Sequence, residues 1–241
     1  TSPASCGGGT ATAIFWTENF GVGCSQGALA SVYTGTNGAW AVTNTGTNDP
    51  DASQWYVSAT ESGMGAGNCG DGCLGTGTTN RTLHVANVSS SPAAFIFCPT
   101  GDCGAAYDTG IGANNVTADK RAESPTINCT GQSNITLTFN YIEGGQTTID
   151  DATLWYFNGA VWAQIDNMPK TVVCGGGQGQ WASRTVVLPA SANNNAAVKI
   201  GYRWVNNDDA TGSDPSFAVD DITLSASSGA GGTGGATVTA S

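Results

Sequence analysis

Two adjacent carboxylates, Asp220 and Asp221, lie in the middle of the apolar stretch SDPSFAVDDITLSA (213–226). Apolar residues alternate in one phase before the two acids and in the opposite phase after them. A β-bulge at the two acids explains the switch, because a bulge adds one residue to a strand and re-aims its side chains. Clustered carboxylates also suit hard divalent cations, which bind through oxygen. This stretch is therefore the first candidate site, and solvated acids at a bend are the alternative.

Three further patterns resemble catalytic sites, and each lacks a feature that its chemistry requires. The segment GCSQG (23–27) matches the G-x-S-x-G elbow of hydrolases, which needs a parallel sheet that nothing here predicts. His84, the only histidine, is out of phase with its apolar neighbours, so we expect it on the solvent side of a strand. Glu143 with Asp150 or Asp151 is a carboxylate pair of glycosidase type, but the sequence shows no sign of a deep cleft. We therefore predict no catalytic residues and no enzyme.

A second acidic stretch, WVNNDDATGSD (204–214), is rich in aspartate and asparagine. It does not match an EF-hand loop, because no glycine stands at the sixth position and no glutamate closes the loop. A solvated turn is the simpler interpretation, and a weak cation site is the alternative.

The charge of the chain excludes several classes of partner. Among 241 residues, 18 are acidic and 7 are Lys or Arg, which gives a net charge of −11. Nucleic acids and anionic membranes need a basic face, so neither is expected as a partner. No apolar stretch is long enough to span a membrane. We expect a mature N-terminus, from which a signal peptide has been removed.

The eight cysteines indicate disulfides and an oxidising, extracellular location. A zinc site is disfavoured, because the chain has one histidine and no Cys-x-x-Cys spacing. Neighbouring positions favour the pairs Cys6–Cys24, Cys69–Cys73 and Cys98–Cys103, which leaves Cys129 and Cys174 for each other. We predict full pairing and no free thiol for the set Cys6, Cys24, Cys69, Cys73, Cys98, Cys103, Cys129 and Cys174.

Short alternating segments predict an antiparallel β-sandwich. SNITLTFNY (133–141) and VKIGYRWV (198–205) each place large apolar residues on one face and small or polar residues on the other. DDATLWYFNGAVWAQI (150–165) indicates a hairpin with Asn158–Gly159 at its turn. We assign residues 1–226 to this domain, and residues 227–241 to a Gly-rich linker followed by a short strand segment.

Several segments resemble parts of MAM-like and related jelly-roll domains. FWTENFGVG (15–23) resembles their first strand, NDPDASQWYV (48–57) the acidic turn that follows, and FAVDDITLSA (217–226) the closing strand. The central run is similar to modules of large secreted bacterial surface proteins, and the likeness covers nearly all of residues 12–226. It implies an all-β, antiparallel two-sheet jelly-roll sandwich with disulfides. The chain departs from MAM domains in its cysteine spacing and in a Cys-containing insertion at 60–105.

The resemblance also implies a cofactor, because jelly rolls of this kind often hold Ca²⁺ between their first and last strands. We predict Ca²⁺ bound by Asp221 and Glu18 together with Asp49 and Asp51, with nearby carbonyl oxygens completing a shell of about six to eight ligands. A metal is favoured over plain bulge acids, since unpaired buried carboxylates are costly.

For function, we predict a non-catalytic extracellular structural or adhesive protein that assembles with itself into a filament. Thr237, Val238 and Thr239 follow the Gly-rich linker and can add as a strand to a neighbouring subunit. Head-to-tail contacts of this kind do not close, so they build a fibre. The alternative is a carbohydrate-binding module for surface glycans, which needs an aromatic platform on one sheet face. Its candidates, for which core packing is the simpler explanation, are Trp155, Trp162, Trp181 and Trp204.

Overall fold

The computed structural model describes residues 12–21, 28–30, 33–70, 80–90, 101–110 and 115–227. These residues form strands and turns, with single-turn 3-10 helices at Gly175–Gly177 and Ala190–Ala192 and no α-helix among them. No helix in this part of the chain is long and apolar enough to cross a membrane. The strands are β1 (Thr12–Glu18), β2 (Ala28–Leu29), β3 (Thr34–Gly35), β4 (Gly38–Ala39), β5 (Ala41–Asn44), β6 (Gln54–Ser58), β7 (Thr82–Ala86), β8 (Ala118–Glu123), β9 (Ile135–Glu143), β10 (Asp151–Phe157), β11 (Trp162–Asn167), β12 (Ala182–Val187), β13 (Lys199–Asn206) and β14 (Phe217–Ser227).

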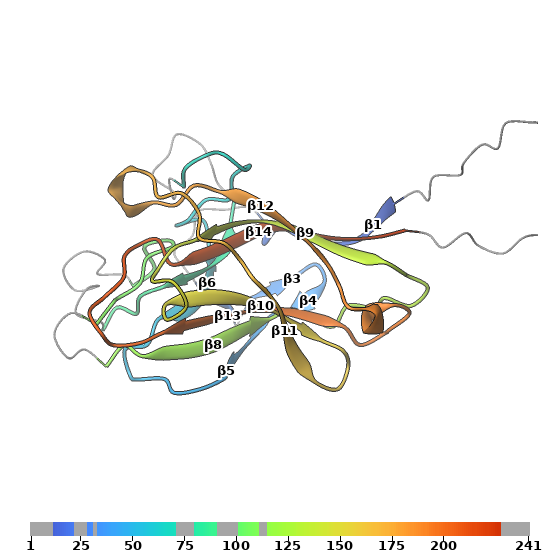
Figure 1. Cartoon of the computed structure of the whole chain (residues 1–241), viewed down its shortest axis with the longest axis horizontal. Coiled ribbons are helices and arrows are strands. Elements are labelled where there is room, and N and C mark those ends of the chain that lie inside the picture. Colours follow the sequence, from blue (N-terminus) through green and yellow to red (C-terminus); the bar gives the residue numbers. More distant parts are fainter. Residues whose placement is uncertain are drawn as a thin grey trace, which may run out of the picture.

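The strands form two antiparallel sheets that pack face to face. The seven-stranded sheet has the order β12-β9-β14-β7-β6-β2, with β1 also paired to β14. The five-stranded sheet has the order β11-β10-β13-β8-β5, and β3 and β4 form a separate ribbon. Figure 1 shows the two layers, with β12, β14 and β9 above β10, β13 and β8. The prediction of an all-β, two-sheet antiparallel sandwich is confirmed.

Apolar side chains that alternate along the strands fill the space between the sheets. In β9, Ile135, Leu137 and Phe139 are fully buried, while the threonines between them face outward. Tyr202 and Trp204 of β13 meet them from the opposite sheet, and the ring centroids of Phe139 and Tyr202 lie 5.5 Å apart. Burying each large apolar side chain contributes about 1.5–3 kcal/mol. The alternation predicted for 133–141 and 198–205 is therefore the pattern of the core.

A bulge in β14 accounts for the change of phase at the two acids. The pairing of β14 with β9 shifts register between Asp220 and Thr223, and Asp221 has a φ of 51°. Before the bulge, Phe217 and Val219 are buried; after it, Ile222 and Leu224 are buried. The extra residue therefore lets one strand keep its apolar side chains in the core along its whole length.

Two loops, which we call the cover loops (residues 59–70 and 101–107), lie over part of the outer face of the seven-stranded sheet. Ala105 of one loop packs with Trp181 and with the outward-facing Ile142 and Ala218 in a small second apolar cluster, against which Met64 also packs. The insertion predicted at 60–105 thus supplies both cover loops and β7 between them. The outer face of this sheet is therefore partly closed to solvent.

The cover loops explain why one prediction about His84 is wrong. His84 is on the outer face of β7, as its phase predicted, because its neighbours Leu83 and Val85 are in the core. Its exposed fraction is nevertheless 0%, since the cover loops bury it. The sequence shows the phase of a strand residue, but it does not show which distant loop lies above it.

The cysteine pairing differs from the one predicted from proximity in sequence. Cys69 of a cover loop forms a disulfide with Cys174, across a sequence separation of 105 residues. Cys129 is a free, buried thiol. The pairs Cys69–Cys73 and Cys129–Cys174 are therefore wrong, and so is the absence of a free thiol. Cys103 is also disulfide-bonded, and Cys6, Cys24, Cys73 and Cys98 lie outside the described residues.

The pairing can be checked on the intact protein. We expect a peptide map without reduction to contain a fragment that joins Cys69 to Cys174, and a thiol reagent to label Cys129 only after denaturation, because burial raises the pKa of its thiol to about 11. Changing Cys69 and Cys174 to serine should lower the stability by about 2–4 kcal/mol, since the bridge closes a long loop. A Cys69–Cys73 fragment would contradict the structure.

Candidate functional site

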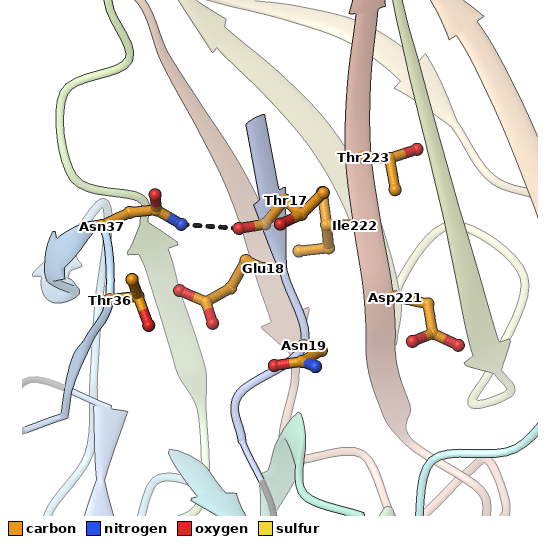
Figure 2. A pocket seen from close by; sticks show the side chains of 8 residues that line it. All are labelled: Thr17, Glu18, Asn19, Thr36, Asn37, Asp221, Ile222 and Thr223. Carbon is orange, nitrogen blue, oxygen red and sulfur yellow. Dashed lines mark hydrogen bonds between the residues drawn. The ribbon is translucent and has the colours of Figure 1, made fainter. Parts of the chain in front are cut away.

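The predicted metal ligands Glu18 and Asp221 both line one polar pocket of about 480 Å³, at the end of β1 and beside the bulge in the middle of β14. Figure 2 shows this pocket, with the two carboxylates on either side of β1 in the view. A hydrogen bond of 2.6 Å from Asn37 Nδ2 to the Thr17 carbonyl closes one side. The lining is almost entirely polar and comprises Thr17, Glu18, Asn19, Thr36, Asn37, Asp221, Ile222 and Thr223.

Glu18 is held by three hydrogen-bond donors from its own end of the molecule. Its Oε1 accepts from the Phe20 backbone N–H at 2.9 Å and from the Tyr33 hydroxyl at 3.3 Å, and its Oε2 accepts from Trp40 Nε1 at 3.3 Å. Glu18 as a residue is 5% exposed. Burial raises the pKa of Tyr33, and the charge of Glu18 beside it raises that pKa further, so the tyrosine remains a neutral donor. Glu18 is therefore fixed at the pocket by the β1–β4 region.

The other two predicted ligands are occupied elsewhere. Asp49 Oδ2 accepts from the Thr117 backbone N–H at 3.1 Å, and Asp51 Oδ1 accepts from the Ser90 hydroxyl at 2.5 Å. Neither residue lines the pocket. Among the described residues, which include the acidic stretch 204–214, no three side chains of His, Cys, Asp or Glu form a group that could hold a metal ion. Of the four predicted ligands, the structure therefore brings Glu18 and Asp221 to one pocket and leaves Asp49 and Asp51 outside it.

Of the two acids at the bulge, the buried one is Asp220. Its exposed fraction is 0%, and its Oδ2 accepts from Asn80 Nδ2 at 2.7 Å. Its Oδ1 is buried without a hydrogen-bond partner among the described residues. Burial raises the pKa of Asp220 to about 8, and the adjacent charge of Asp221 adds to this effect. Asp221 is exposed and accepts from Asn140 Nδ2 at 3.2 Å.

A second candidate site lies on the outer face of the five-stranded sheet, and we call it the aromatic–arginine face (Arg121, Trp155, Phe157, Trp162 and Arg203). These residues come from β8, β10, β11 and β13, at positions that alternate with the core residues of those strands. Phe157 and Trp162 are directly paired across β10 and β11, with ring centroids 5.3 Å apart. Their alternation with core residues directs all five side chains outward.

The Arg121 guanidinium lies between two tryptophans on this face. Its Cζ is 4.0 Å from the ring centroid of Trp162 and 5.6 Å from that of Trp155. Gly201 lies beneath it, and a Cβ there would come within 2.9 Å of Arg121 Cδ. The missing side chain at position 201 therefore lets Arg121 cross the sheet toward the indole rings, where a cation over an aromatic face is attracted by it.

Each arginine of the aromatic–arginine face forms an ion pair with a carboxylate of the same sheet. Arg121 Nε and Nη2 donate to Glu123 Oε1 at 3.1 and 2.8 Å. Arg203 Nε and Nη2 donate to the two oxygens of Asp119 at 2.7 and 2.6 Å. Arg121 and Arg203 are direct cross-strand partners, a like-charge pair that is unfavourable without such carboxylates. The face therefore presents indole rings bordered by fixed, paired charges.

The structure separates the four tryptophan candidates into two kinds. Trp155 and Trp162 are half-buried on the aromatic–arginine face, whereas Trp181 and Trp204 are 1% exposed and belong to apolar clusters. Sequence reasoning did not find Arg121 and Arg203, although each is out of phase with the core residues of its strand. The sequence could have indicated both arginines, because their phase directs them outward and an outward-facing tryptophan lies on a neighbouring strand.

The residues considered for catalysis are in closed surroundings. His84 Nε2 lies 2.7 Å from Asp102 Oδ1 with both residues buried. Glu143 is fully buried, and its Oε1 accepts from Lys170 Nζ at 3.0 Å and from the Ala152 backbone N–H at 3.0 Å. Burial raises the pKa of Glu143 to about 8. A substrate reaches neither residue, and the segment GCSQG (23–27) lies wholly outside the described residues.

No family model and no curated protein matches the chain. It is similar in structure to the K1 cleaved adhesin domain of Lys-gingipain from Porphyromonas gingivalis, at 15% identity and a TM-score of 0.44 over 90% of this chain and 98% of that one. It is also similar to a xylan-binding domain (CBM22-1) from Paenibacillus barcinonensis, at 10% identity and a TM-score of 0.40 over 92% and 99%. A third likeness is to a cyclase from Fischerella sp. TAU, at 12% identity and a TM-score of 0.46 over 90% and 98%.

These three likenesses differ in the roles that the proteins' names state, and their TM-scores are all below 0.5. They therefore carry no argument about what this chain binds or does. Because no family model matches, the resemblance to MAM-like domains stays a prediction.

Calcium binding at Glu18 and Asp221 also stays a prediction, and a melting experiment checks it. If the ion binds the native state, adding millimolar Ca²⁺ to protein treated with EGTA raises the melting temperature. The variant E18Q should lose that increase, while D51N should keep it, since Asp51 lies outside the pocket. A melting temperature that does not respond to Ca²⁺ would remove calcium from the description of this site.

The buried carboxyl of Asp220 predicts a specific dependence of stability on pH. Because its pKa is raised from 3.8 to about 8, its contribution is fully present below pH 3.8 and is lost as the pH rises through about 8. We expect D220N, measured in EGTA, to lose less stability than the wild type between pH 5 and pH 8.5. D221N is the comparison variant: it keeps the titrating carboxyl but removes the adjacent charge that helps to raise its pKa, so it should still lose stability over this range, beginning at a lower pH. Equal slopes for D220N and wild type would refute the assignment.

Proposed function

We propose that the chain is a non-catalytic extracellular binding domain and that the aromatic–arginine face binds carbohydrate. The observation that supports this most directly is the pair of half-buried tryptophans, Trp155 and Trp162, placed on the outer face of a sheet around the Arg121 guanidinium. Of the seven tryptophans in the chain, these two remain partly exposed on the outer face of a sheet. Large aromatic rings in such positions are candidates for ligand contact.

The chemistry of the face matches the two sides of a sugar. A pyranose ring has an apolar face of C–H groups that packs on an aromatic ring, and a rim of hydroxyls that hydrogen-bonds to fixed polar groups. The indoles supply the first, and the partly exposed carboxylate of Asp119, already oriented by the Arg203 guanidinium, supplies an acceptor for the second. Oriented groups of this kind lose little entropy on binding, which favours affinity.

The charge balance favours a neutral glycan. Both guanidinium groups of the face are engaged by carboxylates of the same face. A sulfated or phosphorylated polymer would compete with those pairs and would meet a chain with a net charge of −11. The arginines therefore serve as stacking partners and hydrogen-bond donors more than as anion receptors.

Two other parts of the prediction are kept as proposals. The Cys69–Cys174 disulfide supports an extracellular location, because such bridges persist in oxidising compartments. Assembly with itself through Thr237, Val238 and Thr239 concerns residues outside the described part of the chain. A filament therefore stays a prediction, and glycan binding is the function that the described geometry supports.

The test is binding of the purified chain to a panel of neutral and acidic polysaccharides, followed by titration calorimetry with the best ligand. We expect W155A and W162A each to weaken binding about tenfold or more, since removing an aromatic anchor typically costs more than about 1 kcal/mol. V187A is the matched control, because Val187 is 69% exposed on β12 of the opposite sheet.

The melting temperatures of all three variants should be measured alongside, so that a loss of binding can be separated from a loss of folding. The proposal fails if no polysaccharide binds, or if W155A and W162A bind as the wild type does.

A further inference from the structure

Outside the two candidate sites, the hydrogen-bond partners of one buried side chain define its protonation, and that side chain is His84 beneath the cover loops. It is the only histidine in the chain and is 0% exposed. Its ring stacks on Tyr56 of β6, with centroids 6.3 Å apart. Across the strand it pairs with Ala218 of β14, which has no ionisable side chain. The charged groups that face it, Asp102 and Glu61, both come from the cover loops.

The hydrogen bonds around His84 define where its protons are. Thr82 Oγ1 lies 2.9 Å from His84 Nδ1 and donates its single hydroxyl proton to the Glu61 carbonyl, also at 2.9 Å. A hydroxyl that has donated its proton can only accept, so Nδ1 must carry a hydrogen and donate to it. This fixes the first ring nitrogen as protonated.

The second ring nitrogen faces a carboxylate that is itself surrounded by donors. Asp102 Oδ1 lies 2.7 Å from His84 Nε2 and also accepts from the Gly104 backbone N–H at 3.2 Å. Asp102 Oδ2 accepts from the Ser58 hydroxyl at 2.6 Å. Besides the contact with the histidine, the carboxyl thus accepts from two donors, Gly104 and Ser58, and such hydrogen bonds favour its ionised form. Nε2 therefore donates as well, and a ring that donates from both nitrogens carries a positive charge.

We propose that His84 is a buried imidazolium in the folded protein and that its ion pair with Asp102 latches the cover loops onto β6 and β7. The latch joins Ser58 and Thr82, at strand ends, to Glu61 and Asp102, one in each loop. Breaking one side of a buried ion pair leaves an uncompensated charge, so the two loops and the strands are held together or released together.

The electrostatics agree with this geometry. Burial lowers the pKa of His84, but the charge and hydrogen bond of Asp102, with a smaller effect of Glu61, outweigh it and leave the pKa raised above 6.5. Burial raises the pKa of Asp102, and His84 with the Ser58 hydrogen bond outweighs it and lowers the pKa to about 2. The latch is therefore complete between pH 3.8 and 6.5, weakens as the pH rises through the pKa of His84, and weakens in acid toward pH 2.

Because His84 is the only histidine, its protonation can be observed directly in the intact protein. In ¹⁵N-labelled protein at pH 6.5, we expect both imidazole nitrogens to show the shifts of protonated nitrogen, with two N–H protons slow to exchange with water. Raising the pH should convert the ring to a neutral form only well above 6.5. One unprotonated ring nitrogen at pH 6.5, which is what Thr82 donating to Nδ1 would produce, would overturn the proposal.

Hydrogen exchange at constant pH 6.5 tests whether the pair holds the loops. We expect D102N to increase amide exchange in residues 101–107 about tenfold or more, because opening of a local unit sets the exchange rate. S58A is the graded comparison, since it removes one hydrogen bond to Asp102 but keeps the ion pair, and it should increase exchange by much less than D102N does. If D102N leaves His84 doubly protonated, or exchanges as slowly as the wild type, the latch is wrong.

Discussion

The arrangement of the molecule depends on a single β-bulge in β14, at Asp220 and Asp221. This strand pairs with β9 along both halves, with β7 before the bulge and with β1 after it. Without the extra residue, a strand of this length would turn its second set of apolar side chains to the outside. Asp221 takes the left-handed backbone conformation that the bulge requires, with a φ of 51°, which aspartate tolerates better than most residues. One irregular residue therefore lets a single strand pair with β7 before the bulge and with β1 after it while its apolar side chains stay in the core.

The bulge also divides the outer face of the seven-stranded sheet into two regions. Before it, the outward residues Ala218 and Asp220 are fully buried under the cover loops and their surroundings. After it, the outward residues Thr223 and Ser225 are only half-buried. Buried polar groups lie in the first region, among them His84, Asp102 and Asp220. Such groups are costly unless they are paired, so the cover loops are fixed by polar contacts that a purely apolar cover would not require.

Much of the fold could be predicted from the sequence, because alternation with a period of two is a local property. It located the core face of β9 and β13, the phase of His84 and the bulge itself. What could not be predicted depends on the path of long loops. The partner of Cys69 is Cys174, 105 residues away, because the cover loop reaches the segment before β12 and not its own neighbour in sequence. The burial of His84 has the same cause. For the metal set, Glu18 and Asp221 do share a pocket, but Asp49 and Asp51 were chosen by residue type alone.

The use of the few basic residues connects the fold to the proposed binding face. The chain has seven Lys and Arg residues. Four of them are in ion pairs: Arg121 with Glu123, Lys170 with Glu143 and Asp151, Arg184 with Asp166, and Arg203 with Asp119. Lys120 is buried, with its Nζ donating to the Ser53 carbonyl. Most of the basic side chains therefore contact groups within the protein, and they are not free to bind anionic ligands. Recognition at the proposed aromatic–arginine face would therefore rest on direct contact with partly exposed rings and fixed hydrogen-bonding groups, and not on attraction of anions.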